Sequence, residues 1–173
     1  ININFTILLS LCFIFGCSTN SKSTSNVIYY TTYDESIMYP SKCDFNANII
    51  SNTYTNGKGV IKFDGDVTTI GENAFSYCDN LTSVNIPDSV TSIGEHAFYY
   101  CTSLTSVNIP DSVTTIGYGA FYSCTSLTSV YCKATTPPSL GDSSVFDYNG
   151  SSRKIYVPAG SVNAYKSATN WSE

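Results

Sequence analysis

Apolar and polar residues repeat along the middle of this chain with a fixed period, which takes Leu81 to Leu104 and Leu104 to Leu127. Residues 81–103 read LTSVNIPDSVTSIGEHAFYYCTS and residues 104–126 read LTSVNIPDSVTTIGYGAFYSCTS, so the two copies differ at four positions. A fixed period of this length is the signature of a solenoid, in which every repeat forms one coil and packs on its neighbours. The pattern therefore predicts a stack of coils.

Within one unit, the pattern predicts two extended pieces and a compact third segment. In LTSVNIP, apolar Val and Ile alternate with polar Ser and Asn, which is the period of a strand with one buried face. Pro-Asp-Ser then favours a turn, and V-T-S/T-I-G directs a second apolar pair inward. The A-F-x-x-C segment has its apolar residues at helical spacing. Stacking is expected to align Val84, Val107 and Val130 in one buried column and Phe75, Phe98 and Phe121 in another.

The repeat continues beyond the two central copies in degenerate form. Residues 58–80 form a weaker first copy, LTSVYC begins a fourth at residue 127, and RKIYVP near residue 155 is similar to the start of one more strand. We assign the repeats to residues 58–132, and a degenerate last repeat with a C-terminal cap to residues 133–173. In that cap, we expect a short helix over residues 162–168 and packing by Trp171.

Residues 27–57 are expected to cover the other end of the stack. Residues 27–33 and 49–54 are rich in β-branched and aromatic residues, which predicts two strands. Asn56-Gly57 favours a tight hairpin turn into a further strand at residues 59–63. A solenoid needs such a cap because its end coils would otherwise expose the apolar core.

The unit L-x-x-V-x-I-P-x-S-V-x-x-I-G-x-x-A-F-x-x-C resembles the BspA-like subfamily of leucine-rich repeats. The resemblance covers residues 58–132 strongly and extends more loosely to Tyr165. It implies a β-rich α/β repeat, namely a short leucine-rich-repeat solenoid with N- and C-terminal caps. Members of this subfamily are mostly surface-exposed or secreted proteins of bacteria and some mucosal parasites, and several are adhesins. The resemblance thus implies a recognition function.

The start of the chain, residues 1–17, predicts export. Its near-apolar run FTILLSLCFIF is too short to span a membrane as a helix but suits the hydrophobic region of a signal peptide. IFGC at residues 14–17 is similar to a bacterial lipobox, so we expect lipidation of Cys17; ordinary signal cleavage and a core helix are the alternatives. Residues 18–26 are polar and predict a flexible tether. The expected location is the bacterial cell envelope, as an outer-membrane or cell-surface lipoprotein held by its lipid.

Charge and composition argue against several function classes. The net charge is −5, and the eight basic residues are scattered, whereas nucleic-acid binding needs clustered Lys and Arg. The single histidine, His96, stands at a freely varying repeat position that we expect at the surface, so no Ser-His-Asp or Cys-His arrangement with a second imidazole and no histidine-based metal cluster is available. We expect neither enzymatic activity nor a cofactor.

The cysteines of the repeats predict packing rather than chemistry. Cys78, Cys101 and Cys124 recur once in each repeat and should share one buried column, where a free thiol behaves as a small apolar group. Cys132 stands at a buried strand position. No CxxC pair or second histidine supports a metal site. Cys43 has no repeat partner, and a disulfide there is left open.

Two surfaces remain as candidate ligand-binding sites. The first is a polar stripe at outward strand positions, made by Lys62, Asn85, Asn108 and Tyr131. The second comes from the two residues between Phe and Cys of each unit, which should point away from the core. These residues are Ser76-Tyr77, Tyr99-Tyr100 and Tyr122-Ser123, and Tyr118 lies close in sequence. Tyrosine offers large amphipathic area at low entropic cost, although the rings could also simply cover the turns.

Together these features predict a cell-surface recognition or adhesion module. Its expected ligand is a protein or glycan on host or neighbouring cells, bound through a repeat surface. A non-catalytic structural or assembly component of the cell envelope is the alternative.

Overall fold

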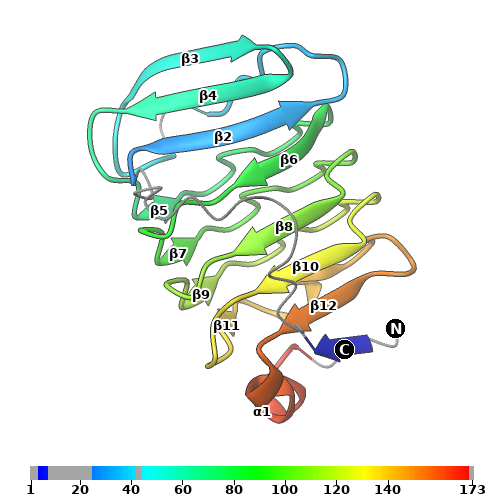
Figure 1. Cartoon of the computed structure of the whole chain (residues 1–173). Coiled ribbons are helices and arrows are strands. Elements are labelled where there is room, and N and C mark those ends of the chain that lie inside the picture. Colours follow the sequence, from blue (N-terminus) through cyan, green and yellow to red (C-terminus); the bar gives the residue numbers. More distant parts are fainter. Residues whose placement is uncertain (1–3, 8–24, 42–43, 172–173) are drawn as a thin grey trace, which may run out of the picture.

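The computed structural model describes residues 4–7, 25–41 and 44–171, and the repeats form a β-solenoid (Figure 1). One side of the solenoid is an eight-stranded sheet. Its repeat strands are the parallel neighbours β6 (Leu81–Asn85), β8 (Ser106–Ile109), β10 (Ser129–Cys132) and β12 (Lys154–Val157). The successive segments 58–80, 81–103, 104–126 and 127–151 are called coil 1, coil 2, coil 3 and coil 4 below.

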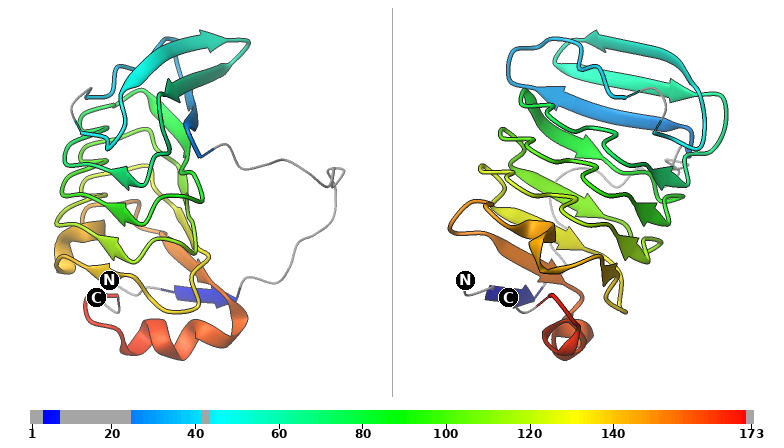
Figure 2. Two further views of the ribbon diagram at one scale, coloured as in Figure 1. Left: turned by 90° about the vertical axis from the view of Figure 1, so that its left-hand side faces the viewer. Right: turned by 180° about the vertical axis from the view of Figure 1, so that it is seen from behind.

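The second short piece of each unit builds a smaller parallel sheet. Its strands are β5 (Thr69–Ile70), β7 (Ser92–Ile93), β9 (Thr115–Ile116) and β11 (Ser139–Leu140). Partner residues lie one repeat apart, as in Ile93 with Ile116. Figure 2 shows that this sheet runs along a different side of the solenoid from the eight-stranded one.

The core lies inside the coils and consists of the columns that the period predicts. Phe75, Phe98 and Phe121 are fully buried and stack with ring centroids 5.0 Å apart at both steps. Phe146 of coil 4 continues the stack at 5.5 Å, and Phe45 closes it at the other end with an edge contact of 5.6 Å. The valine column is also confirmed, since Val107 and Val130 pair in register and are buried.

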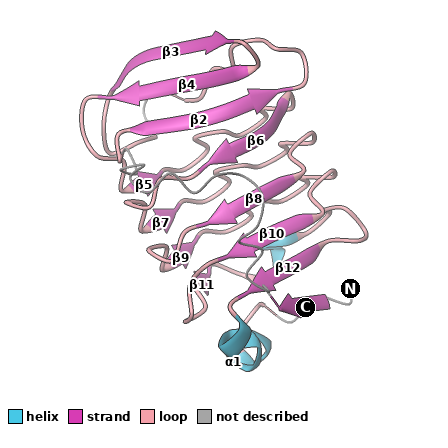
Figure 3. Cartoon of the chain, viewed as in Figure 1, coloured by secondary structure: helices cyan, strands magenta, loops and turns pink. Residues whose placement is uncertain are grey.

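The A-F-x-x-C segments are turns, so the helix suggested by their spacing is wrong. Asn73 and Tyr77 of coil 1 have φ values of 56° and 59°, and the left-handed conformation cannot continue a right-handed helix. It directs N–H groups to the next coil instead: Tyr77 donates to the carbonyl of Tyr99 at 2.7 Å, and Asn73 donates to that of Glu95 at 3.0 Å. Among the described residues, helix is confined to short pieces in coil 4 and the C-terminal cap (Figure 3).

The N-terminal cap confirms the predicted hairpin but changes the place of the first repeat. β2 (Val27–Thr32), β3 (Ile49–Thr55) and β4 (Lys58–Phe63) are antiparallel, and the turn between β3 and β4 is Asn56-Gly57, with both φ values positive. β4 was expected to begin coil 1 beside β6, but β2 lies between them. The repeat pattern of coil 1 is kept only in its second half, where β5 pairs with β7.

The C-terminal cap follows the prediction. After the 3₁₀ turns Ser143–Phe146 and Ala159–Ser161 comes the helix α1 (Val162–Ser167). Trp171 is buried, with its ring 5.8 Å from Phe146 and 4.9 Å from Tyr165. These aromatic residues cover the apolar end of coil 4.

The expected export segment is described only at Asn4–Ile7. These residues form β1, which pairs in parallel with β12 at the edge of the large sheet. Cys17, the rest of the segment, most of the tether and Cys43 lie outside the described residues, so the lipid anchor and the signal peptide stay predictions. In the described part of the chain, no helix is long and apolar enough to cross a membrane.

Candidate binding surfaces

The second residue after the core phenylalanine is left-handed in every coil. Tyr77, Tyr100, Ser123 and Tyr148 have φ values of 59°, 57°, 56° and 54°. This conformation suits glycine, and a bulky residue in it is uncommon and costs of the order of 1 kcal/mol. Coil 3 places a serine there, so the backbone does not require tyrosine. Three of the four coils nevertheless place a tyrosine at this position.

These residues and their neighbours form a continuous surface that we name the tyrosine ridge: Tyr77, His96, Tyr99, Tyr100, Tyr118, Tyr122 and Tyr148. Tyr77 stacks on Tyr100 with centroids 5.4 Å apart, and Tyr99 stacks on Tyr122 at the same distance. Tyr122 then contacts Tyr148 at 5.1 Å. The structure thus brings the tyrosines of coils 1 to 3 together, as predicted, and adds Tyr148 of coil 4.

Several ridge side chains are open to solvent. Tyr77 is 67 % exposed, Tyr148 66 %, Tyr118 48 % and Tyr100 39 %. Contiguous exposed rings of this kind are a feature of interaction surfaces.

Two serines beside the ridge do not point outward as expected. Ser123 is only 7 % exposed, and the hydroxyl oxygen of Ser76 is buried without a hydrogen-bond partner. Tyr122 contacts Tyr100 and Tyr148, which flank Ser123 along the stack. A serine side chain is too short to reach past such rings.

His96 and Tyr148 belong to the ridge although neither was predicted as a site residue. The His96 ring lies 4.8 Å from that of Tyr99 and 5.1 Å from that of Tyr118. It is therefore half-buried between two tyrosines, rather than freely exposed. Tyr148 stands two residues after Phe146, as Tyr77 does after Phe75, so the same offset would have identified it in spite of the insertions in coil 4.

The inner tyrosines of the ridge stay neutral over a wide pH range. Desolvation raises the pKa of Tyr99, and the neighbouring phenol of Tyr100 adds to the shift. Desolvation likewise raises the pKa of Tyr122, with a further contribution from Tyr148. At neutral pH Tyr99 and Tyr122 therefore offer uncharged hydroxyls on apolar rings, which can both stack and form hydrogen bonds.

The polar stripe on the large sheet forms across β6, β8 and β10 as predicted, but Lys62 was wrongly included, because β2 lies between its strand β4 and β6. Asn85 pairs with Asn108, and Asn108 pairs with Tyr131, so the three share one row across β6, β8 and β10. Both asparagines are exposed and Tyr131 is half-buried. The row continues to Tyr156, whose ring stacks on that of Tyr131 at 4.7 Å.

A shallow depression of about 320 Å³ lies where this stripe meets the N-terminal cap, and Asn85, Asn108 and Lys58 contribute to its lining. The amino group of Lys58 lies 4.1 Å above the Tyr29 ring. These cap residues were not predicted, because the pairing of β2 with β6 joins segments that are far apart in the chain.

The repeat cysteines occupy the predicted buried column. The Cys101 thiol donates to the carbonyl of Phe75 at 3.0 Å, and that of Cys124 donates to the carbonyl of Phe98 at 3.1 Å. Burial raises the pKa of Cys124 to about 12, and also raises that of Cys101. Such thiols are protonated at neutral pH and unreactive. Within the described ranges, no group of three His, Cys, Asp or Glu side chains is placed to hold a metal ion.

Parallel coils of one repeat unit each, with buried columns and capped ends, define a leucine-rich-repeat solenoid with an open surface. The family model described as "BspA type Leucine rich repeat region (6 copies)" matches residues 45–170. The chain belongs to this family. The six copies extend into the segments that we assigned to the caps. Proteins of the family are generally interaction or surface modules and are typically not catalytic.

A solved structure similar to this chain is a leucine-rich repeat protein from Bacteroides ovatus. It is 32% identical, the match covers 61% of this chain and 27% of that chain, and the TM-score is 0.43. The chain thus spans about a quarter of that protein's length. No match was found among curated proteins.

Proposed function

We propose that this chain is a cell-surface recognition module that binds a protein or glycan through the tyrosine ridge. One observation carries the proposal: exposed tyrosines occupy a left-handed position that the fold can fill with a serine. Unfavourable backbone conformations retained at a surface are typical of functional sites. The family relationship supports it, because BspA-type proteins are typically exported surface proteins of bacteria.

The charges near the ridge favour a protein ligand with exposed Lys or Arg. Glu72 and Glu95 are exposed and hold the repeat position that Tyr118 fills in coil 3. The whole chain carries a net charge of −5. A basic side chain could therefore pair with a carboxylate and lie over a tyrosine ring.

The test is binding of the full 173-residue chain to immobilised matrix proteins, mucins and glycans. The ridge variant replaces Tyr77, Tyr100 and Tyr148 with serine, the residue that coil 3 already has at this position. The matched control replaces Tyr33 and Tyr39, which are 65 % and 80 % exposed and lie outside the ridge. We expect the natural chain to bind one of these ligands saturably. The ridge variant should bind it with an affinity lower by about ten-fold or more, and the control should keep the affinity of the natural chain.

Other outcomes reject the ridge or the function. Equal binding by the ridge variant and the natural chain would move the site to the polar stripe or a cap. If the correctly folded chain bound no ligand and instead co-purified with one envelope protein in fixed ratio, a structural role would replace recognition.

A further inference from the structure

The regular hydrogen bonding between coils is interrupted between coil 3 and coil 4. Thr114 of coil 3 donates its N–H to the carbonyl of Thr91 at 2.9 Å. Pro138 holds the corresponding place in coil 4 and has no N–H, so Ser139 donates to the carbonyl of Thr114 instead, also at 2.9 Å. The loop that joins the two strands of a coil is one residue longer in coil 4 than in coil 3. At its start Cys132 pairs with Ile109, and at its end Ser139 pairs with Thr115.

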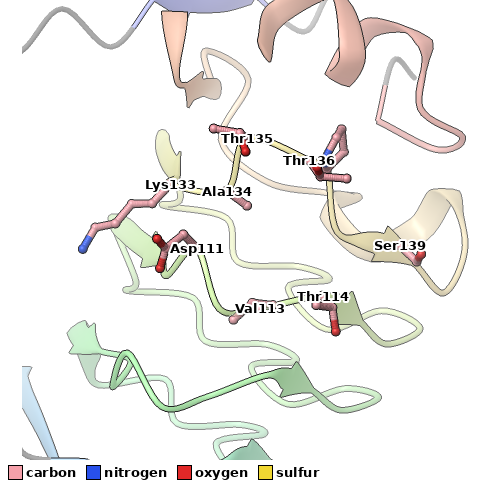
Figure 4. A pocket seen from close by; sticks show the side chains of 9 residues that line it. Asp111, Val113, Thr114, Lys133, Ala134, Thr135, Thr136 and Ser139 are labelled. Atoms are coloured by element: carbon pink, nitrogen blue, oxygen red, sulfur yellow. The ribbon is translucent and has the colours of Figure 1, made fainter. Parts of the chain in front are cut away.

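The extra residue leaves a cavity of about 430 Å³ between the two coils (Figure 4). Its volume falls in the range typical of small-molecule sites. The polar side chains of the lining are Asp111, Thr114, Thr135, Thr136 and Ser139. Pro137 adds apolar surface, whereas Val113 is only 1 % exposed and lies at the base of the lining. The amino group of Lys133 points outward, away from the threonines of its own loop.

The C-terminal cap holds the loop of this cavity in place. The Tyr165 hydroxyl donates to the carbonyl of Ala134 at 2.9 Å, and the Trp171 indole donates to that of Pro138 at 2.8 Å. Both aromatic side chains are buried, and two consecutive prolines further restrict the backbone. The cavity is therefore formed before any ligand arrives, which lowers the entropic cost of binding.

We propose that this cavity binds one neutral sugar residue of a glycan. A carboxylate can accept hydrogen bonds from two adjacent sugar hydroxyls, and the hydroxyls of Thr135, Thr136 and Ser139 can both donate and accept. The Thr114 hydroxyl donates to the carbonyl of Thr91 and can therefore only accept from a ligand. Pro137, which is half-buried in the lining, suits the C–H face of the sugar ring. One carboxylate is too few for a metal site, and Asp111 disfavours an anionic ligand. This site is separate from the tyrosine ridge and does not rest on the function proposed for it.

The experiment is calorimetric titration of the full chain with glucose, galactose, mannose, fucose and N-acetylglucosamine. The test variant is Asp111→Asn, which keeps the shape of an exposed side chain but removes its charge. Asp88→Asn is the matched control, because Asp88 lies one repeat earlier, is also exposed, and faces a regular coil. We expect one of the sugars to bind saturably at a single site. Asp111→Asn should lower the affinity for that sugar by about ten-fold, and Asp88→Asn should leave the affinity unchanged.

Thr136→Val provides a second test on the coil 4 side of the cavity, opposite Asp111 of coil 3. It should lower the affinity for the same sugar without altering the far-UV circular dichroism spectrum. Absence of saturable binding by every sugar would overturn the proposal. So would equal losses in the Asp111→Asn and Asp88→Asn variants. Saturable binding of uncharged tetrapeptides that is lost in Asp111→Asn, with no sugar bound, would reassign the cavity to peptide recognition.

Discussion

At the scale of single residues, the stacking of coils depends on the glycine that follows the short strand of the smaller sheet in each coil. This glycine is Gly94 after β7 and Gly117 after β9. A Cβ on Gly94 would lie 2.7 Å from the backbone nitrogen of Glu72, and one on Gly117 would lie 2.5 Å from that of Glu95. Gly94→Ala should therefore lower the free energy of unfolding by about 1–3 kcal/mol, because backbone must shift in two coils. Urea denaturation followed by circular dichroism measures the change. Gly160→Ala is the control, since a Cβ there meets nothing within 4 Å; a loss of similar size in both variants would contradict the explanation.

The buried thiols should make stability fall at alkaline pH. Burial raises the pKa of Cys78 and Cys124 to about 12, whereas a thiol in the unfolded chain titrates near about 8.5. The folded chain then holds more protons than the unfolded chain between these values. The stability that the thiols contribute is complete below about pH 8.5 and is lost as the pH rises toward 12.

Cys124→Ala should accordingly reduce the slope of stability against pH above about pH 8.5. Urea unfolding at a series of pH values, under reducing conditions, measures that slope. Cys124→Ser keeps the size of the side chain and removes the titration near this pH, and should show the same smaller slope. An unchanged slope in both variants would assign the alkaline loss to other groups, such as the buried tyrosines.

At the scale of elements, the phenylalanine column joins the coils into one core. Phe98 is fully buried and contacts a phenylalanine on either side, whereas Phe45 is half-buried at the end of the column. Phe98→Ala should cost about 3–5 kcal/mol, and Phe45→Ala should cost clearly less. Thermal or urea unfolding of the two variants tests the difference. Equal losses would mean that the column is no more tightly packed at its centre than at its end.

The elements that could be predicted are those with local signals. Val and Ile alternating with polar residues predicted the strands of coils 2 and 3. Asn56-Gly57 predicted the cap hairpin because its turn needs two positive φ values. The spacing of apolar residues in the A-F-x-x-C segment suggested a helix wrongly, because residues three apart also lie close together in successive turns. The place of β2 between β4 and β6 depends on pairing between distant segments, for which one sequence carries no local signal.

The candidate surfaces were predictable to a similar degree. Exposure of the ridge tyrosines and the strand asparagines follows from position within the repeat. The left-handed backbone at Tyr77 and Tyr100 was not predictable, because tyrosine itself disfavours that conformation. The cavity between coils 3 and 4 arises from one inserted residue in the loop and the cap aromatics that hold it, so it became evident only with the register of both sheets.

At the scale of the whole molecule, each coil contacts mainly its neighbours, so damage at one end should remain local. Trp171 packs on Phe146 and Tyr165 at the coil 4 end. Trp171→Ala should increase amide hydrogen exchange in β11 and the glycine that follows it, where Ser139 and Gly141 donate to coil 3, more than in β7. Hydrogen–deuterium exchange read by mass spectrometry resolves the two regions. Trp171→Phe keeps most of the packing but loses the indole N–H, and should give a smaller increase. A uniform increase across all coils would show instead that the solenoid unfolds as a single cooperative unit, in which the cap stabilises every coil equally.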